Sequence, residues 1–523
     1  MEISKNVERY LTILEVSQKQ AYIFASNKLH DNIVNSAVIA WVMSGEYFEE
    51  AVNDKSVFSK EVNLVYSGGG HTILEFEEKI QAYEATKRIT TRIMKEYPGI
   101  EVFAATMAYD EVENPGENIK NLIKKLERKK AMRSAAFHQG SFGVERIDSN
   151  TLKPIMVMGE RNKPVKNEMP AQEKLVDENL SAEEFQNVYE FEKLGGSKGE
   201  SNFIAVVHID GNAMGKRVER IYSDNKKVDW KTYKDKIRRF SESIDEDFKS
   251  AYKDMVQQVE KNIKNGYLED LDMKDKNFPV RRIITAGDDI CFVAEGRIGL
   301  ECAVTFIKAL NKKVNKEDKE GYAACAGVAI VHQKYPFYKA YELAELLCSN
   351  AKKFGAALSA DHSGKDVSAI DWHIEFGEVK DTLEEIRGEY RTEEGAHLEL
   401  RPYIVTASEE IEKRESIRQY NHFKKLITAM QKQEIAYARG KLKELRSVLK
   451  QGEMEAMRYM KFYKMEDIAL EGYQGVFVEV DYNAAKQGKG LERNIFLVTE
   501  DGETRCLLFD AIELLDTYIA LEE

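Results

Sequence analysis

The chain has 523 residues, too many for one ordinary hydrophobic core, so its length predicts roughly two to four domains. A net charge of −13 disfavours a protein whose main task is to coat nucleic acid, because that binding depends on neutralising phosphates with Lys and Arg. We expect a cytoplasmic protein without a membrane span, since there is no apolar run of about 18 residues and no signal-peptide layout. The 5 cysteines include no C-x-x-C pair, which argues against a zinc ribbon.

Hydrophobic patterning predicts two units with the same order of elements. In the first unit we expect a strand over 10–16, a helix over 31–51, a strand-turn-strand over 62–77, a helix over 78–96, a strand over 101–109 and a basic helix over 118–133. In the second unit we expect a strand over 203–210, helical sequence to about 264, a hairpin over 279–296, a helix over 297–313, a strand over 323–332, a helix over 337–353 and a strand over 367–374. This near-repeat predicts an α/β (α+β) protein with two ferredoxin-like palm domains built on mixed sheets.

The composition shifts where we place the domain boundaries. The predicted division is a catalytically silent first palm at 1–135, a connector at 136–200, a catalytic second palm at 201–376 and a mainly helical domain at 377–523. The connector is polar and contains three prolines, whereas 407–464 is charged with apolar residues at helical spacing. The last segment, from VFVEVDYN onward, predicts two strands and a final helix.

Three aspartates carry the chemistry that we predict. Asp288 and Asp289 follow Gly287 at the tip of the second hairpin, and Asp210 ends the first strand of the same unit. Gly-Asp-Asp alone would suit an ordinary polar β-turn. In a palm, however, the first strand lies beside the central hairpin, so the three carboxylates can converge. Oxygen ligands of this kind suit Mg²⁺ or Mn²⁺, which places Asp210, Asp288 and Asp289 as metal ligands and catalytic residues.

The turn after Asp210 is suited to phosphate. Gly211, Asn212 and Ala213 form a small turn before a helix, where backbone N–H groups can cradle a triphosphate. Bound metal ions would neutralise the phosphates, activate a 3′-hydroxyl and stabilise the leaving pyrophosphate. The pattern therefore predicts a nucleotidyltransferase that uses a nucleoside triphosphate as substrate.

Several phrases resemble one known family. They are QAYIFASNKLHDNIVNSA (20–37), YSGGGH (66–71), DGNAMGK (210–216), CAGVAIVHQKYPFYKAYELAELL (325–347), AKKFG (351–355), SAIDWH (368–373) and RPY (401–403). Together they resemble the large polymerase-like subunit of type III CRISPR effector complexes, a two-palm family related to GGDEF cyclases. This resemblance implies synthesis of cyclic or short linear oligoadenylates from ATP, by two-metal attack of a 3′-hydroxyl, in antiviral defence.

The resemblance also implies roles for residues outside the aspartates. Gly287 and the 211–213 turn would approach phosphates, and Lys352 or Lys353 would reach a phosphate. The hairpin Ser67, Gly68, Gly69 and Gly70 would line the pocket of a second nucleotide. The plainer interpretations are a solvated helix end for the lysines and a glycine hairpin with only a folding role.

The sequence departs from the family pattern at three points. Ala286 stands where the family has the first Gly of its GGDD turn, which loses a backbone angle open only to Gly. The first palm begins near residue 8 and His30-Asp31 lacks flanking metal ligands, so we expect a variant without the family's HD nuclease domain. The connector has no cysteine, so no structural zinc is expected.

Two other functions stay open at this level. One is a non-catalytic scaffold subunit of a type III CRISPR ribonucleoprotein, which would bind guide RNA, target RNA and partner subunits. The other is a diguanylate-type cyclase that acts as a symmetric homodimer. His208 lies on the same strand face as Asp210, and we interpret it as a packed strand histidine rather than a substrate contact.

Overall fold

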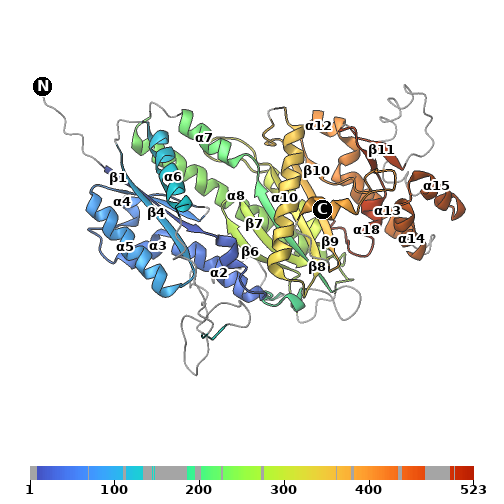
Figure 1. Ribbon diagram of the computed structural model, residues 1–523, viewed down its shortest axis with the longest axis horizontal. Coiled ribbons are helices and arrows are strands. Elements are labelled where there is room, and N and C mark those ends of the chain that lie inside the picture. Colours follow the sequence, from blue (N-terminus) through green and yellow to red (C-terminus); the bar gives the residue numbers. More distant parts are fainter. Residues whose placement is uncertain are drawn as a thin grey trace.

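The structure is a computed structural model of the whole chain. It describes residues 9–68, 70–109, 114–132, 144, 146–147, 185–194, 202–224, 228–271, 276–360, 362–377, 382–433, 439–465, 495–499 and 501–522. No helix within these ranges is long and apolar enough to cross a membrane. Figure 1 shows the two palms side by side, with the C-terminal region beyond the second palm.

The first palm is a four-stranded antiparallel sheet in the order β2-β3-β1-β4. Its strands are β1 (Arg9–Ser17), β2 (Leu64–Gly68), β3 (His71–Phe76) and β4 (Glu101–Tyr109). Its helices are α1 (Lys19–Ile23), α2 (Leu29–Val42), α3 (Gly45–Val52), α4 (Lys60–Asn63), α5 (Lys79–Glu96) and α6 (Pro115–Ala131). The helix expected over 31–51 is two helices, because Ser44 adopts an extended backbone and its side chain caps α3 by accepting from the Tyr47 amide.

The second palm repeats the first and extends it. Its six strands lie in the order β10-β9-β8-β5-β7-β6, where β8 and β9 are parallel and the other neighbours are antiparallel. The strands are β5 (Phe203–Gly211), β6 (Val280–Ala286), β7 (Asp289–Glu295), β8 (Ala324–His332), β9 (Ser368–Glu375) and β10 (Tyr403–Thr406). The helices are α7 (Met214–Asp224), α8 (Trp230–Lys264), α9 (Gly299–Asn311) and α10 (Phe337–Leu358). The predicted α/β fold with a mixed sheet is therefore confirmed.

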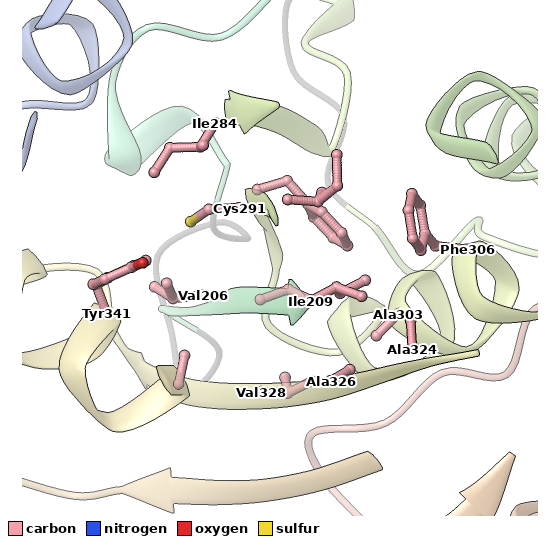
Figure 2. Packing of buried hydrophobic residues seen from close by; sticks show 14 of the residues in the cluster. Val206, Ile209, Ile284, Cys291, Ala303, Phe306, Ala324, Ala326, Val328 and Tyr341 are labelled. Carbon is pink, nitrogen blue, oxygen red and sulfur yellow. The ribbon is translucent and has the colours of Figure 1, made fainter. Parts of the chain in front are cut away.

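Helices cover both faces of the second sheet. Figure 2 shows Phe306 and Ala303 of α9 on the side of Ile209, and Tyr341 of α10 on the side of Cys291. The α10 face is packed unusually closely at one point. A Cβ added to Gly327 of β8 would lie 2.0 Å from the Ala344 carbonyl oxygen and 2.3 Å from the Cys348 amide nitrogen, so only glycine lets α10 lie this near the sheet.

The C-terminal region is mainly helical, as predicted, and its first strand joins the second palm. It contains α11 (Leu383–Gly388), α12 (Glu409–Arg414), α13 (Tyr420–Gln433), α14 (Arg439–Leu449) and α15 (Glu453–Phe462), then β11 (Phe496–Val498), β12 (Thr504–Cys506) and α18 (Phe509–Glu513). β10 pairs with β9, so the palm sheet continues past the boundary expected at 376. The stretch VFVEVDYN and most of the 136–200 connector lie outside the described residues.

A buried ion pair ties this region together. The Arg401 guanidinium lies 2.8 Å from a Glu513 carboxylate oxygen, and both side chains are fully buried. Arg401 also stacks between the rings of Trp372 and Tyr390. The last described residues return to the palm, where the Leu521 amide donates to Glu301 on α9 at 3.0 Å.

Candidate active site

The strand register brings two of the predicted aspartates together. β5 and β7 are neighbours, and Asp210 lies directly opposite Asp289. Asp288 occupies the tip of the β6–β7 hairpin, where its carbonyl oxygen accepts from the Gly211 amide at 3.1 Å. The pairing of β5 with β7 thus places carboxylates that are 79 positions apart in the sequence on adjacent strand ends.

The hairpin turn explains why Ala286 is tolerated. The left-handed position of the turn is Gly287, with φ at 65°. Ala286 is the last residue of β6 and pairs with Asp289 in the ladder. The need for glycine therefore falls on Gly287, and a small side chain at 286 fits strand geometry.

The carboxylates crowd one another, which is the usual signature of a cation site. Burial, together with the charge of Asp210, raises the pKa of Asp288 to about 6 and that of Asp289 to about 7. One carboxylate oxygen of Asp289, Oδ1, is buried and has no hydrogen-bond partner among the described residues. It lies 3.4 Å from Nδ1 of His208, without the alignment of a hydrogen bond.

His208 behaves as a packed histidine, in agreement with its interpretation from the sequence. Its ring is buried and lies edge-on to Tyr341, with ring centroids 5.5 Å apart. Burial lowers the pKa of His208, which favours the neutral imidazole at pH 7. A neutral ring beside Asp289 gives that carboxylate no balancing charge.

Lys352 is the lysine that reaches the aspartates. Its ammonium lies 2.5 Å from Asp210 Oδ2 and donates to the Gly211 carbonyl at 3.1 Å. Burial disfavours its charge, but the Asp210 carboxylate outweighs burial, and the pKa of Lys352 is raised. Lys353 is exposed on the same helix, so of the two candidates Lys352 is positioned beside the site.

The 211–213 turn is used differently from what we expected. The Gly211 and Asn212 amides donate to the Asp288 and Ala323 carbonyls within the protein, and are not available to phosphate. The Asn212 side chain is buried and donates to the carbonyls of Gly364 and Val367, at 2.9 and 2.8 Å. Asn212 therefore holds the turn in place. Ala213, with φ at 58°, lines a cavity, and the first turn of α7 follows it.

A cavity of about 800 Å³ lies between the two palms and joins the two predicted halves of the site. The second palm contributes Ala286, Gly287 and Asp289 to its wall. The first palm contributes Ser67, Gly68 and Gly70, whereas Gly69 lies outside the described residues. The glycine hairpin of the first palm and the aspartate hairpin of the second thus face the same space, although they lie far apart in the sequence.

One further cavity borders Asp210, and another borders the turn that follows it. One, of about 640 Å³, is lined by His208, Asp210 and Lys352 together with α10. The other, of about 450 Å³, adjoins Ala213 and is lined by four basic side chains, Lys120, Lys216, Arg220 and Lys365. Asp210 and Asp289 therefore stand between spaces large enough for parts of a nucleotide.

The sequence analysis missed residues that the first palm contributes. Gln20 Nε2 donates to the Tyr341 hydroxyl and to Glu345 on α10, both at 3.2 Å. Lys19 lines the cavity between the palms, and its charge opposes the rise in the pKa of Asp289 that burial and Asp210 cause. The phrase that begins at residue 20 drew attention to this segment, but nothing local indicates that it meets another domain.

The aspartates fit a divalent cation in part. Among the described residues, no group of three or more His, Cys, Asp or Glu side chains is arranged to hold a metal ion, so the predicted three-ligand set is not assembled. Asp210 and Asp289, with the unpartnered Oδ1, remain a suitable pair. Magnesium commonly takes one or two protein carboxylates and completes its shell with substrate phosphates and water.

Comparison with known proteins agrees with this geometry. Residues 203–358 match the model of the Cas10/Cmr2 second palm domain. The second palm is a Cas10/Cmr2 palm. The match ends at the last residue of α10 and covers β5 to β8 with both aspartate segments. No curated protein matches the chain.

The Cas10-like fold extends over the whole chain. A Csm1–Csm4 cassette crystallised with cA4 superposes with a TM-score of 0.55 at 15% identity, covering 98% of this chain and 70% of the matched chain. The same cassette with one ATP gives 0.54 at 15% identity, with coverage of 98% and 70%. With AMPPNP it gives 0.54 at 14% identity, with the same coverage. At this identity the likeness establishes the fold.

Proposed function

We propose that this Cas10-like chain is a metal-dependent nucleotidyltransferase, which converts ATP or another nucleoside triphosphate into cyclic or short linear oligonucleotides in CRISPR-type antiviral defence. The observation that carries the proposal is the cavity between the palms. It has Asp289 and Gly287 on one wall and Ser67, Gly68 and Gly70 on the other, as a reaction between two nucleotides requires.

The reaction would join a 3′-oxygen of one nucleotide to the α-phosphorus of another. A new P–O bond forms, the bond to pyrophosphate breaks, and the 3′-hydroxyl loses its proton. Asp210 and Asp289, with Asp288 nearby, would hold Mg²⁺ or Mn²⁺, which when bound would offset phosphate charge and acidify the hydroxyl. Positioning and charge stabilisation would supply most of the rate enhancement.

The chain's own groups would orient the substrate. Lys352 fixes Asp210 and the Gly211 carbonyl, so the strand end is rigid before substrate arrives. The first-turn N–H groups of α7, beside Ala213, would bind the triphosphate. Because His208 is neutral, the Asp289 carboxylate would be available to bind a metal cation instead of pairing with a charged histidine.

The structural relatives support a nucleotide as ligand. Csm1–Csm4 cassettes have been crystallised with ATP, AMPPNP, pppApA and cA4. We extend this to the present chain as substrate and product classes, and we propose that it assembles with a Csm4-like subunit within an RNA-guided complex. The scaffold alternative shares this assembly but predicts no turnover.

The decisive experiment is incubation of the pure chain with each nucleoside triphosphate and Mg²⁺ or Mn²⁺, with and without partner subunits and target RNA, followed by mass spectrometry of the products. We expect oligonucleotide products that disappear in Asp288→Ala/Asp289→Ala. Equal product from that variant would refute the catalytic assignment. Absence of product in every mixture would favour the scaffold.

A further inference from the structure

The segment between β1 and α1 carries a lysine into the cavity between the palms. β1 ends at Ser17, and Gln18 adopts a left-handed backbone, with φ at 51° and ψ at 41°. This turn reverses the chain, so that Lys19 begins α1 beside the glycine hairpin of β2 and β3. The Val16 amide donates to the Gly70 carbonyl at 3.1 Å, which fixes the hairpin to the end of β1.

Gly70 leaves the space that the Lys19 side chain occupies. A Cβ at position 70 would lie 2.5 Å from Lys19 Cδ and 2.8 Å from Nζ, and the φ of Gly70 is 81°. The backbone angle therefore favours glycine at position 70, and a Cβ there would displace the end of the flexible Lys19 side chain. The plainer interpretation, a hairpin whose glycines serve folding only, does not account for the position of Lys19.

The neighbouring segment holds Lys19 at the junction of the palms. Gln20 is tied to Tyr341 and Glu345 on α10 of the second palm, so the start of α1 is anchored on both sides. Lys19 and Asp289 line the same cavity of about 800 Å³. A group bound between the palms would thus meet a positive charge from the first palm and a negative charge from the second.

Two other lysines of this cavity lie close to acids. Lys130 lies 2.9 Å from a Glu15 oxygen and 3.0 Å from a Glu127 oxygen. Lys249 lies 2.7 Å from Asp245. The Lys19 ammonium rests against the glycine hairpin, at the wall that faces the aspartate tip.

We propose that Lys19 binds a phosphate group of the nucleotide held against Ser67, Gly68 and Gly70, and that Gly70 leaves room for this lysine. The proposal rests on the proposed function for the presence of a second nucleotide. Lysine acts here as a point charge, which suits a phosphate that must shift during reaction. The first palm, although it lacks aspartates of its own at the hairpin, supplies charge to the shared site.

Binding of AMPPNP in the presence of Mg²⁺ tests Lys19 without requiring turnover. We expect the natural protein to bind two molecules of AMPPNP per chain. In Lys19→Gln the affinity for one of the two should fall by about ten- to a hundred-fold, which is the range for the loss of one charge-assisted hydrogen bond. Lys19→Arg should retain most of the affinity. Gly70→Ala, which displaces the lysine, should lower the affinity for the same AMPPNP molecule.

Lys28→Gln is the matched control, since Lys28 is an exposed lysine of the same palm. It should bind AMPPNP as the natural protein does, and the thermal midpoint of Lys19→Gln should be unchanged. Equal affinities for Lys19→Gln and the natural protein would overturn the proposal. If the natural protein makes no product from any triphosphate, the proposed function fails, whereas the AMPPNP titration still decides the role of Lys19.

Discussion

Replacing Asp289 by asparagine should stabilise the metal-free protein while removing its activity. The pKa of Asp289 is raised by burial and Asp210 from 3.8 to about 7. The stability that a carboxyl with a raised pKa contributes is fully present below its pKa in the unfolded chain. This stability is lost as the pH rises through its pKa in the folded protein. The asparagine side chain cannot ionise, so the variant escapes a penalty that is complete in the natural protein once the pH exceeds the folded pKa of Asp289.

The size of this effect follows from the shift. A rise in pKa of that size lowers the free energy of unfolding by about 4 kcal/mol at pH 8, before solvent screening is considered. The Asp289 side chain is 37% exposed, so solvent screening reduces the effect to about 1–2 kcal/mol. In a protein of 523 residues the thermal midpoint should rise by about 1–2 °C.

The assay is thermal unfolding in EDTA at pH 8 and at pH 5, with Asp235→Asn, an exposed site on α8, as control. The gain of Asp289→Asn should be largest at pH 8 and smaller at pH 5, where Asp289 is mostly protonated in the folded protein. Millimolar Mn²⁺ should raise the midpoint of the natural protein and not that of the variant. A variant that is less stable at pH 8 without metal, or a difference independent of pH, would refute the reasoning.

Three other substitutions test the framework around the site. Gly327→Ala should push α10 away from the sheet and lower the free energy of unfolding, measured by chemical denaturation, by at least about 1–3 kcal/mol. It should also reduce product formation, because Lys352 moves with the helix. Unchanged turnover would contradict this. Asn212→Ala should cost about 1–3 kcal/mol, seen as a lower urea midpoint, by orphaning two buried carbonyls. Glu513→Gln should cost up to about 3–5 kcal/mol, because it leaves the buried Arg401 with only the Asp510 carboxylate at 3.7 Å, whereas a loss under about 1 kcal/mol would show that the pair is not needed.

The aspartate pair could be predicted from the sequence because the residues that indicate it are close together in the chain. A strand that ends in Asp210 and a hairpin that ends in Asp288-Asp289 each have a recognisable pattern, and the palm order then places them side by side. The strand β4 was predicted over 101–109 and has those bounds in the structure. Hydrophobic period and turn residues are sufficient for predictions of this kind.

The roles of Asn212 and Lys19 could not be predicted in the same way. Asn212 lies in a turn whose residue types suit a phosphate, and only the approach of the 364–367 segment shows that its amide is used inside the protein. Lys19 is one lysine among many in the sequence. Its position against Gly70 depends on how two segments 51 residues apart pack, and no periodicity encodes that.

The pairing of β10 with β9 determines where this chain can be divided. β9 lies beyond the 203–358 match, and β10 belongs to the mainly helical region. A fragment that stops at residue 376 would leave the backbone groups of β9 open along an apolar edge, a template for pairing with other chains. Expression of the second palm alone therefore invites aggregation, whereas a fragment that retains the residues through β10 covers β9 and ends the sheet in a strand of only 4 residues.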